Sequence, residues 1–152
     1  MQNYTRGDLA ALPLNDVDLE NTYSVQDYLD VAVLDTDRVN QSATGEYAIH
    51  QYKDYLSTEI RCIIRWEGQT DVAPALSPVY LQIYNRNTNV WDTIDQNPTL
   101  YGATFSPYGA ETPYYGGRNA DTDFVLTADL SDITNYKDAN NMISCRVYQL
   151  AI

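Results

Sequence analysis

Residues 79–95, VYLQIYNRNTNVWDTID, decide the fold class of this chain. In the first half of this stretch Val79, Leu81 and Ile83 alternate with polar or aromatic residues, which is the period-2 pattern of a half-buried β-strand. The run at 85–89 is rich in residues that tolerate a left-handed backbone, and the alternation then returns at 90–94. The stretch therefore predicts an antiparallel hairpin with a five-residue loop.

Similar alternation recurs on both sides of this hairpin, and no amphipathic helix longer than two turns is expected. The region 71–78 carries two prolines and is expected to be a loop, and 131–141 is expected to be a polar turn with one helical turn at most. Further strands are expected at 31–34, 47–55, 59–66, 123–130 and 142–150. Short strands without helical partners predict an all-β fold, a two-sheet antiparallel β-sandwich of jelly-roll type, with an immunoglobulin-like sandwich as the alternative.

The length of 152 residues suits one domain with a sizeable core. Residues 1–24 are polar, acidic and without periodicity, so we expect an extended N-terminal arm that is not part of the core. Residues 25–152 then form a single sandwich domain, with a long aromatic loop at 96–121. The first 20 residues lack both a basic region and an apolar stretch long enough for a secretory signal, so we expect no export by that route if Met1 is the native start.

The charge of the chain excludes several classes of function. Nine basic residues against 21 acidic ones give a net charge of −12, and only Lys53 and Lys137 are lysines, whereas 14 residues are tyrosines. Binding to nucleic acid needs clustered Lys and Arg, so we expect no nucleic-acid partner. No apolar run approaches the roughly 18 residues of a membrane span, so we expect no membrane partner.

Nothing in the sequence points to catalysis, and we expect that the protein is not an enzyme. His50 is the single histidine, no G-x-S-x-G elbow surrounds a serine, and nucleotide-binding or zinc-protease motifs are absent. A glycosidase that uses two carboxylates is the one enzyme class left open, and its only support is that the chain has many carboxylates. No cofactor is expected. Calcium is the one cation that the acidic pairs at 35–37 and 121–123 and the nearby Asp129, Asp132 and Asp138 would suit, although solvated charge at turns is the simpler interpretation.

Cys62 and Cys145 lie on apolar faces of two expected strands. Two cysteines are too few for a disulfide framework or a zinc site, so two buried thiols are favoured. A single bridge between neighbouring core strands remains the alternative.

Tyrosines supply the candidate binding residues. Tyrosine gives a large contact area with few torsions to freeze, and it is enriched in protein interfaces, where lysine is depleted. The aromatic loop could stack on sugar rings, contact a protein, or simply cover one end of the sandwich; loops of this length tend to be functional. The candidates are Tyr101, Phe105, Tyr108, Tyr114 and Tyr115 in the loop, and Tyr80, Tyr84 and Tyr148, which are expected to face outward from the strands.

Four segments carry a resemblance to a known group of proteins. They are YAIHQYKD (47–54), IRWEGQTDVAPALSPVYLQIYNRNTNVWDTID (64–95), ADTDFVLTADLSDITNYKDANN (120–141) and ISCRVYQ (143–149). They resemble an uncharacterised β-sandwich module of phage, prophage and metagenomic surface or virion structural proteins. Relatives of this kind join the segments equivalent to 91–95 and 120–124 by a short turn, so the resemblance implies that 96–119 is an insertion, where binding is often located.

These features together lead to an expected function. We expect a non-enzymatic virion structural protein, such as a tailed-phage head decoration protein, assembled in the host cytoplasm and located on the virion surface. Its partners would be the capsid shell and itself, as a homo-oligomer that docks through the arm and the Tyr-rich surface. The first alternative is a carbohydrate-binding or host-adhesion module that uses the Tyr-rich loop. The second is an extracellular filament subunit that donates its arm as a strand.

Overall fold

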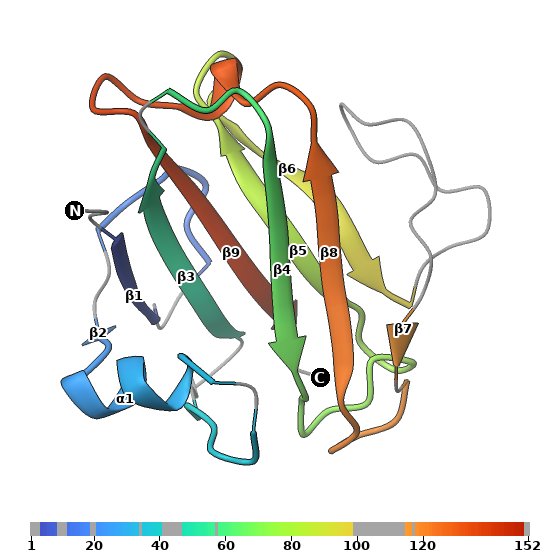
Figure 1. Cartoon of the computed structure of the whole chain (residues 1–152). Helices are drawn as coiled ribbons and strands as arrows, with labels where there is room; N and C mark the ends of the chain where they lie inside the picture. The colour runs from blue at the N-terminus through green and yellow to red at the C-terminus, as the bar shows by residue number, and fades with distance from the viewer. Residues whose placement is uncertain are drawn as a thin grey trace.

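The computed structural model describes residues 4–8, 12–18, 21–33, 35–40, 47–56, 58–98, 115–116 and 118–150. These residues form an all-β fold of two antiparallel sheets with very little helix (Figure 1). The large sheet has the order β2-β1-β3-β9-β5-β6 and the small sheet the order β4-β8-β7. The strands of the large sheet are β1 (Tyr4–Asp8), β2 (Asn21–Thr22), β3 (Tyr47–Tyr55), β5 (Val79–Asn85), β6 (Val90–Asn97) and β9 (Met142–Leu150).

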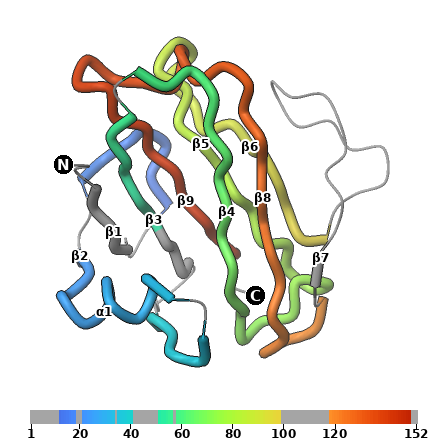
Figure 2. The backbone as a smooth tube through the Cα atoms, in the orientation of Figure 1, coloured from blue at the N-terminus to red at the C-terminus, as the bar shows by residue number. Residues whose placement is uncertain are grey.

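The small sheet consists of β4 (Cys62–Gly68), β7 (Tyr115–Gly116) and β8 (Phe124–Leu130). The chain crosses from β3 in the large sheet to β4 in the small one and returns to β5, as Figure 2 shows. The facing sides of the two sheets enclose one apolar core, and residues at alternate positions of β5, β8 and β9 supply most of it. The core is formed by Ile64, Val79, Leu81, Ile83, Ile94, Phe124, Leu126, Ala128, Leu130, Ile133, Tyr136, Ile143, Cys145 and Val147.

The hairpin that the sequence predicts is confirmed, but its loop is residues 86–89 and not the expected five-residue run at 85–89, because Asn85 still pairs with Val90. β5 and β6 pair from Val79 opposite Asn97 to Asn85 opposite Val90, with a bulge after Leu81. The Asn85 side chain stabilises the turn, because its Oδ1 accepts hydrogen bonds from the N–H groups of Asn87 and Thr88 at 2.9 and 3.1 Å. The other strands expected at 47–55, 59–66, 123–130 and 142–150 are also present, and the expected helical turn within 131–141 is the 3₁₀ turn η1 (Thr134–Tyr136).

The strand expected at 31–34 is wrong. The chain instead forms the short helix α1 (Val25–Asp30), and residues 31–33 turn away from its end. Ser24 and Asp27 form a reciprocal capping box that satisfies the first N–H groups of the helix, and this cap outweighs the weak alternation that follows it. Val31 and Val33 are 45% and 63% exposed, so these apolar side chains face solvent and do not mark a buried strand.

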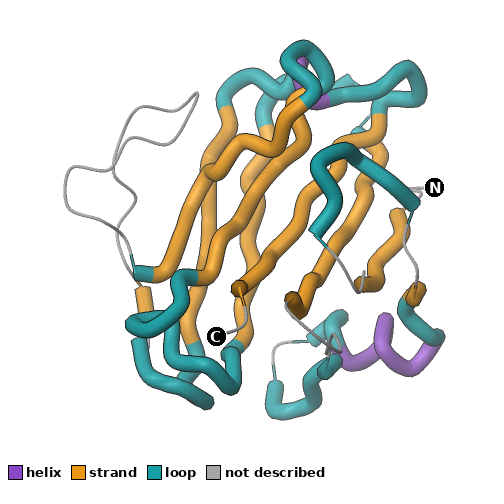
Figure 3. Tube along the Cα trace, turned by 180° about the vertical axis from the view of Figure 1, so that it is seen from behind, coloured by secondary structure: helices purple, strands orange, loops and turns teal. Residues whose placement is uncertain are grey.

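The described part of the N-terminal 24 residues lies against the large sheet. β1 pairs along β3, with Tyr4 opposite Asp54 and Gly7 opposite Gln51. Residues 12–18 then form a loop in front of the side of the large sheet that faces away from the core, which we call the outer face (Figure 3). This segment contributes no residue to the apolar core, and it is bonded to the large sheet through β1 and through Pro13 and Asp16.

Leu81 offers a test of this core. Its side chain is fully buried between the sheets, so Leu81→Ala should lower the free energy of unfolding by about 2–5 kcal/mol. Leu76→Ala is the matched control, because Leu76 is 72% exposed and its truncation should cost less than about 0.5 kcal/mol. Urea denaturation followed by circular dichroism measures both variants, and equal losses would contradict the described packing.

Candidate functional site

The three tyrosines predicted on strands lie on the outer face of the large sheet. Tyr80 and Tyr148 stack with their ring centroids 5.0 Å apart, and both are half-buried. Tyr84 packs edge-on against Trp91 at 5.2 Å and is only 6% exposed. These tyrosines thus point away from the core as expected, and neighbouring side chains cover Tyr84 on that face.

The aromatic loop falls mostly outside the described residues. The positions of Tyr101, Phe105, Tyr108 and Tyr114 are among those not described, and their role in binding stays a prediction. Tyr115 belongs to β7, where its backbone pairs with Val125 of β8.

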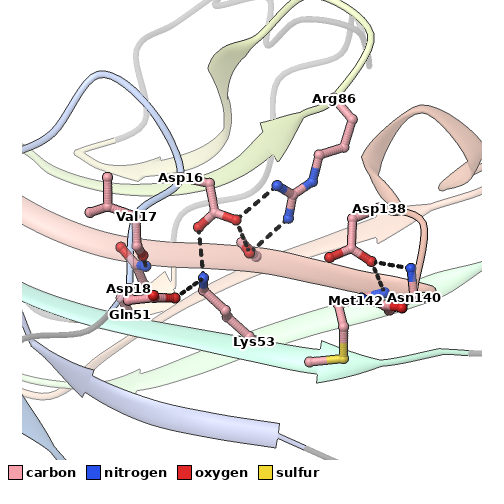
Figure 4. Close-up of polar contacts among 10 residues, drawn as sticks. Asp16, Val17, Asp18, Gln51, Lys53, Arg86, Asp138, Asn140 and Met142 are labelled. Atoms are coloured by element: carbon pink, nitrogen blue, oxygen red, sulfur yellow. Dashed lines mark hydrogen bonds and ion pairs between the residues drawn. The ribbon is translucent and has the colours of Figure 1, made fainter.

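A buried carboxylate holds residues 12–18 on the outer face. The Asp16 side chain is 6% exposed, and its Oδ2 lies 2.8 Å from Nη1 of Arg86 (Figure 4). Oδ1 lies 3.3 Å from Nζ of Lys53, and the hydroxyl of Ser144 donates to Oδ2 at 2.9 Å. Nη2 of Arg86 in turn donates to the Ser144 hydroxyl at 3.0 Å, so β3, β9 and the turn between β5 and β6 all contribute to holding this one side chain.

Arg146, in the middle of β9, makes the second set of contacts with the same segment. It is 4% exposed, and its Nη1 donates to the Pro13 carbonyl at 2.7 Å while its Nε donates to Oε1 of Gln82 at 2.9 Å. The guanidinium lies over the Trp91 ring, 4.1 Å from its centroid, which is a favourable position for a cation. Burial lowers the pKa of Arg146 to about 10, so the group remains charged at neutral pH.

The outer face therefore forms a binding site for an extended segment, residues 12–18. Its cations Lys53, Arg86 and Arg146 contact a carboxylate and a carbonyl of residues 12–18, and the amide of Gln51 donates to the Val17 carbonyl at 3.1 Å. Sequence reasoning missed these residues. The available signal was Arg146 itself, a basic residue between Cys145 and Val147 in a strand with few polar positions.

A second feature lies at the open side of the molecule, between the two sheets. A cleft of about 530 Å³ separates β4 from β3 and from the segment that runs from α1 to Asn40. Its apolar surface comes from Tyr52 and Leu56 of the β3 side, Ile64 and Trp66 of β4, and Ile143 of β9. The Trp66 ring packs directly on Gly68. A Cβ atom at position 68 would lie 2.6 Å from the ring, so only glycine leaves room for the ring in this position.

Carboxylates surround this cleft. Arg38 and Arg65 also line it, but both are already engaged, with Asp123 at 2.8 Å and with Glu67 at 3.0 Å. The acidic residues that line the cleft are Asp30, Asp35, Asp37, Asp54 and Glu67. The cleft is thus anionic as well as aromatic, and it is suited to binding a cationic or hydroxyl-rich group.

The residues considered for metal binding make local hydrogen bonds. Oδ1 of Asp35 accepts from the N–H of Asp37 at 2.8 Å, and Oδ1 of Asp138 accepts from the N–H groups of Asn140 and Met142 at 2.7 and 3.0 Å. Among the described residues, no three His, Cys, Asp or Glu side chains come together as a ligand group.

The two cysteines are free thiols in different sheets. Cys145 is buried in the core, and Cys62 is half-buried at the cleft. Burial raises the pKa of Cys62, and the carboxylates of Asp54, Asp129 and Glu59 add to the effect. For His50 the structure describes only the backbone, which pairs with Val147.

Comparison with known proteins finds no match among protein-family models, curated protein sequences or solved structures. Within the described ranges, no helix has the length and apolar character needed to cross a membrane.

The two aspartates beside Lys53 provide a matched test of the outer-face network. Asp16→Asn should lower the free energy of unfolding by about 1–3 kcal/mol, because it leaves the partly buried Arg86 and Lys53 without their carboxylate. Asp18→Asn should leave it unchanged, because Asp18 is fully exposed and lies 3.7 Å from the same lysine. Chemical denaturation at low ionic strength measures both, and equal behaviour would argue against a structural role for Asp16.

Cys62 should be alkylated more slowly than an ordinary accessible cysteine. Its raised pKa leaves less thiolate at pH 8 than a free cysteine has, so alkylation by iodoacetamide should be slower and should keep accelerating beyond the pH at which free cysteine levels off. Cys145 should react only after unfolding, since it is completely buried. Peptide mapping by mass spectrometry distinguishes the two sites, and faster reaction of Cys145 in the folded protein would contradict this assignment.

Proposed function

We propose that this protein is a non-enzymatic structural component of a virus particle, most simply a head decoration protein of a tailed phage or a similar capsid-surface component. In this proposal it assembles on the virion surface with the capsid shell and with copies of itself. The resemblance of residues 47–54, 64–95, 120–141 and 143–149 to phage and surface modules supports this class of protein.

The observation that carries the proposal is the way the outer face holds residues 12–18. A chain with a net charge of −12 places Lys53, Arg86 and Arg146 together on one sheet face and uses them to bind an extended segment. The same receptor could hold the equivalent segment of a neighbouring copy, because the bonds are made to a carboxylate and to carbonyl groups that any copy offers. Exchange of identical elements between subunits is a common route to oligomers.

Strand order supports the finer description of the fold as a jelly roll. β3 and β9, the first and last long strands, lie side by side, and the chain passes between sheets at β3–β4, β4–β5, β6–β7 and β8–β9. Side-by-side first and last strands are usual in double-sheet jelly rolls, which are common in viral capsid proteins. An immunoglobulin-like sandwich is the less favoured description.

Size-exclusion chromatography with light scattering tests the proposal. The full chain should form a homo-oligomer whose population rises with concentration, and removal of residues 1–24 should shift it to monomer. Because the same contacts hold the segment in monomer and oligomer, Asp16→Asn should speed the exchange between the two states, whereas Asp18→Asn should leave the exchange rate unchanged. The two point variants are needed because the deletion also removes β1 and β2 from the sheet.

A protein that stays monomeric at all concentrations and binds an immobilised glycan would overturn the structural role and favour the adhesion alternative. Particle binding gives a second readout. Co-sedimentation with capsids assembled from a tailed-phage major capsid protein should be saturable for the shell that it decorates, and lack of co-sedimentation across a panel of such shells would count against a decoration role.

A further inference from the structure

Strand β4 has a single neighbour among the described strands. It pairs with β8 from Cys62 opposite Leu130 to Gly68 opposite Phe124, and none of the other described strands hydrogen-bonds to its opposite edge. Edges of this length are usually protected, because their open N–H and C=O groups attract another strand. Here Ile63, which lies within β4, is 66% exposed.

The hydrogen bonds of Thr127 identify which groups of β4 face this open edge. Thr127 lies opposite Arg65, but its N–H donates to Asp95 at 2.9 Å and is therefore not bonded to β4. Opposite residues in an antiparallel ladder alternate between hydrogen-bonded and non-bonded pairs, so Arg65 belongs to a non-bonded pair. The N–H and C=O groups of Ile63, Arg65 and Glu67 consequently point toward the open edge.

The cleft lies directly beside this edge. The whole of β4 lines the cleft, and Tyr52 and Leu56 face it across the gap from the β3 side. A strand added next to β4 would extend the small sheet over this apolar surface. Its alternate side chains would enter the cleft, as they do in other cases of strand addition.

Charge defines the kind of segment that fits. The cleft is lined by five carboxylates and by two arginines that are already engaged with Asp123 and Glu67. A segment with positive side chains at alternate positions would place them near Asp35 and Asp37, whereas an acidic segment would be repelled.

We infer that the open edge of β4 and the adjoining cleft form a binding site for an extended cationic segment of a partner protein, which adds to the small sheet as a further antiparallel or parallel strand. The site lies away from the outer face of the large sheet and does not depend on the exchange of residues 12–18. Main-chain bonds to Ile63, Arg65 and Glu67 provide affinity, and the carboxylates select for positive charge.

The test uses the full chain and defined seven-residue peptides, since β4 itself has seven residues. The probe is acetyl-Lys-Val-Lys-Val-Lys-Val-Lys-amide, and its controls are the Glu-Val counterpart and two forms that are N-methylated on either the valines or the inner lysines. Isothermal calorimetry should detect the cationic peptide and not the acidic one. One N-methylated form should lose binding and the other should keep it, because only one set of peptide amides faces β4.

Protection measurements and protein variants locate the site. Amide hydrogen exchange of Ile63, Arg65 and Glu67 should slow when the peptide binds, and alkylation of Cys62, which lines the cleft, should slow as well. Arg65→Pro should abolish binding because it removes an N–H that faces the edge, whereas Arg65→Ala should retain it. The double variant Asp35→Asn, Asp37→Asn should weaken binding by about fivefold.

Several results would overturn the inference. Absence of binding by the cationic peptide, equal binding of both N-methylated forms, or unchanged exchange at Ile63, Arg65 and Glu67 would each do so. Displacement of the peptide by a neutral oligosaccharide that protects Cys62 without slowing exchange in β4 would assign the cleft to sugar binding instead. Because the peptide data need no variant, a misfolded Arg65→Pro would not affect the conclusion. Failure of this site would leave the association test based on residues 1–24 unaffected.

Discussion

Residues 143–147 of β9 are at most 4% exposed, so this strand needs cover on both of its faces. Its odd-numbered side chains, Ile143, Cys145 and Val147, enter the apolar core between the sheets. Its even-numbered ones, Ser144 and Arg146, face the other way and carry hydrogen-bonding groups that must find partners away from water. β9 also pairs with both β3 and β5, so the large sheet, its inner core and its outer polar layer all meet at this strand.

The N-terminal segment meets that requirement. Pro13 offers a carbonyl to Arg146, and Asp16 accepts a hydrogen bond from Ser144 while neutralising Arg86 and Lys53. A buried guanidinium is costly unless it is fully hydrogen-bonded, and the ring of Trp91 supplies further favourable contact. The polar, acidic character of this segment is therefore complementary to the face it covers, and an identical segment from another copy would be equally complementary.

The two sheets are unequal in size, and this inequality creates the second surface. Three strands cannot cover a face built by six, so the side of the molecule near β3 and β4 is left with a cleft and an open strand edge. The outer face and the cleft carry charges of opposite sign. One is cationic and holds an acidic segment of this chain, and the other is anionic and is suited to a cationic segment from elsewhere. One small domain thus carries two surfaces of opposite charge.

Local patterns in the sequence accounted for much of the fold. Alternation at Val79, Leu81 and Ile83 identified a core strand, and the polar run after it identified the turn, because both depend on neighbours within a few residues. The pattern failed at 31–34, where the capping interaction of Ser24 with Asp27 determined a helix instead. It gave the face of Tyr84 correctly but not its burial, since alternation shows which face a side chain takes and not what covers that face.

The sequence by itself thus determined that the protein is an acidic all-β chain with tyrosine-rich surfaces and the hairpin at its centre. Only the tertiary structure decided which strands are neighbours, which edge of β4 stays open and where the scarce cations gather. The physical reason is distance along the chain. Pro13 and Arg146 are separated by 133 positions, and Asp16 and Ser144 by 128. No periodic pattern in the sequence relates residues so far apart, and they become partners only when the folded sheet brings them together.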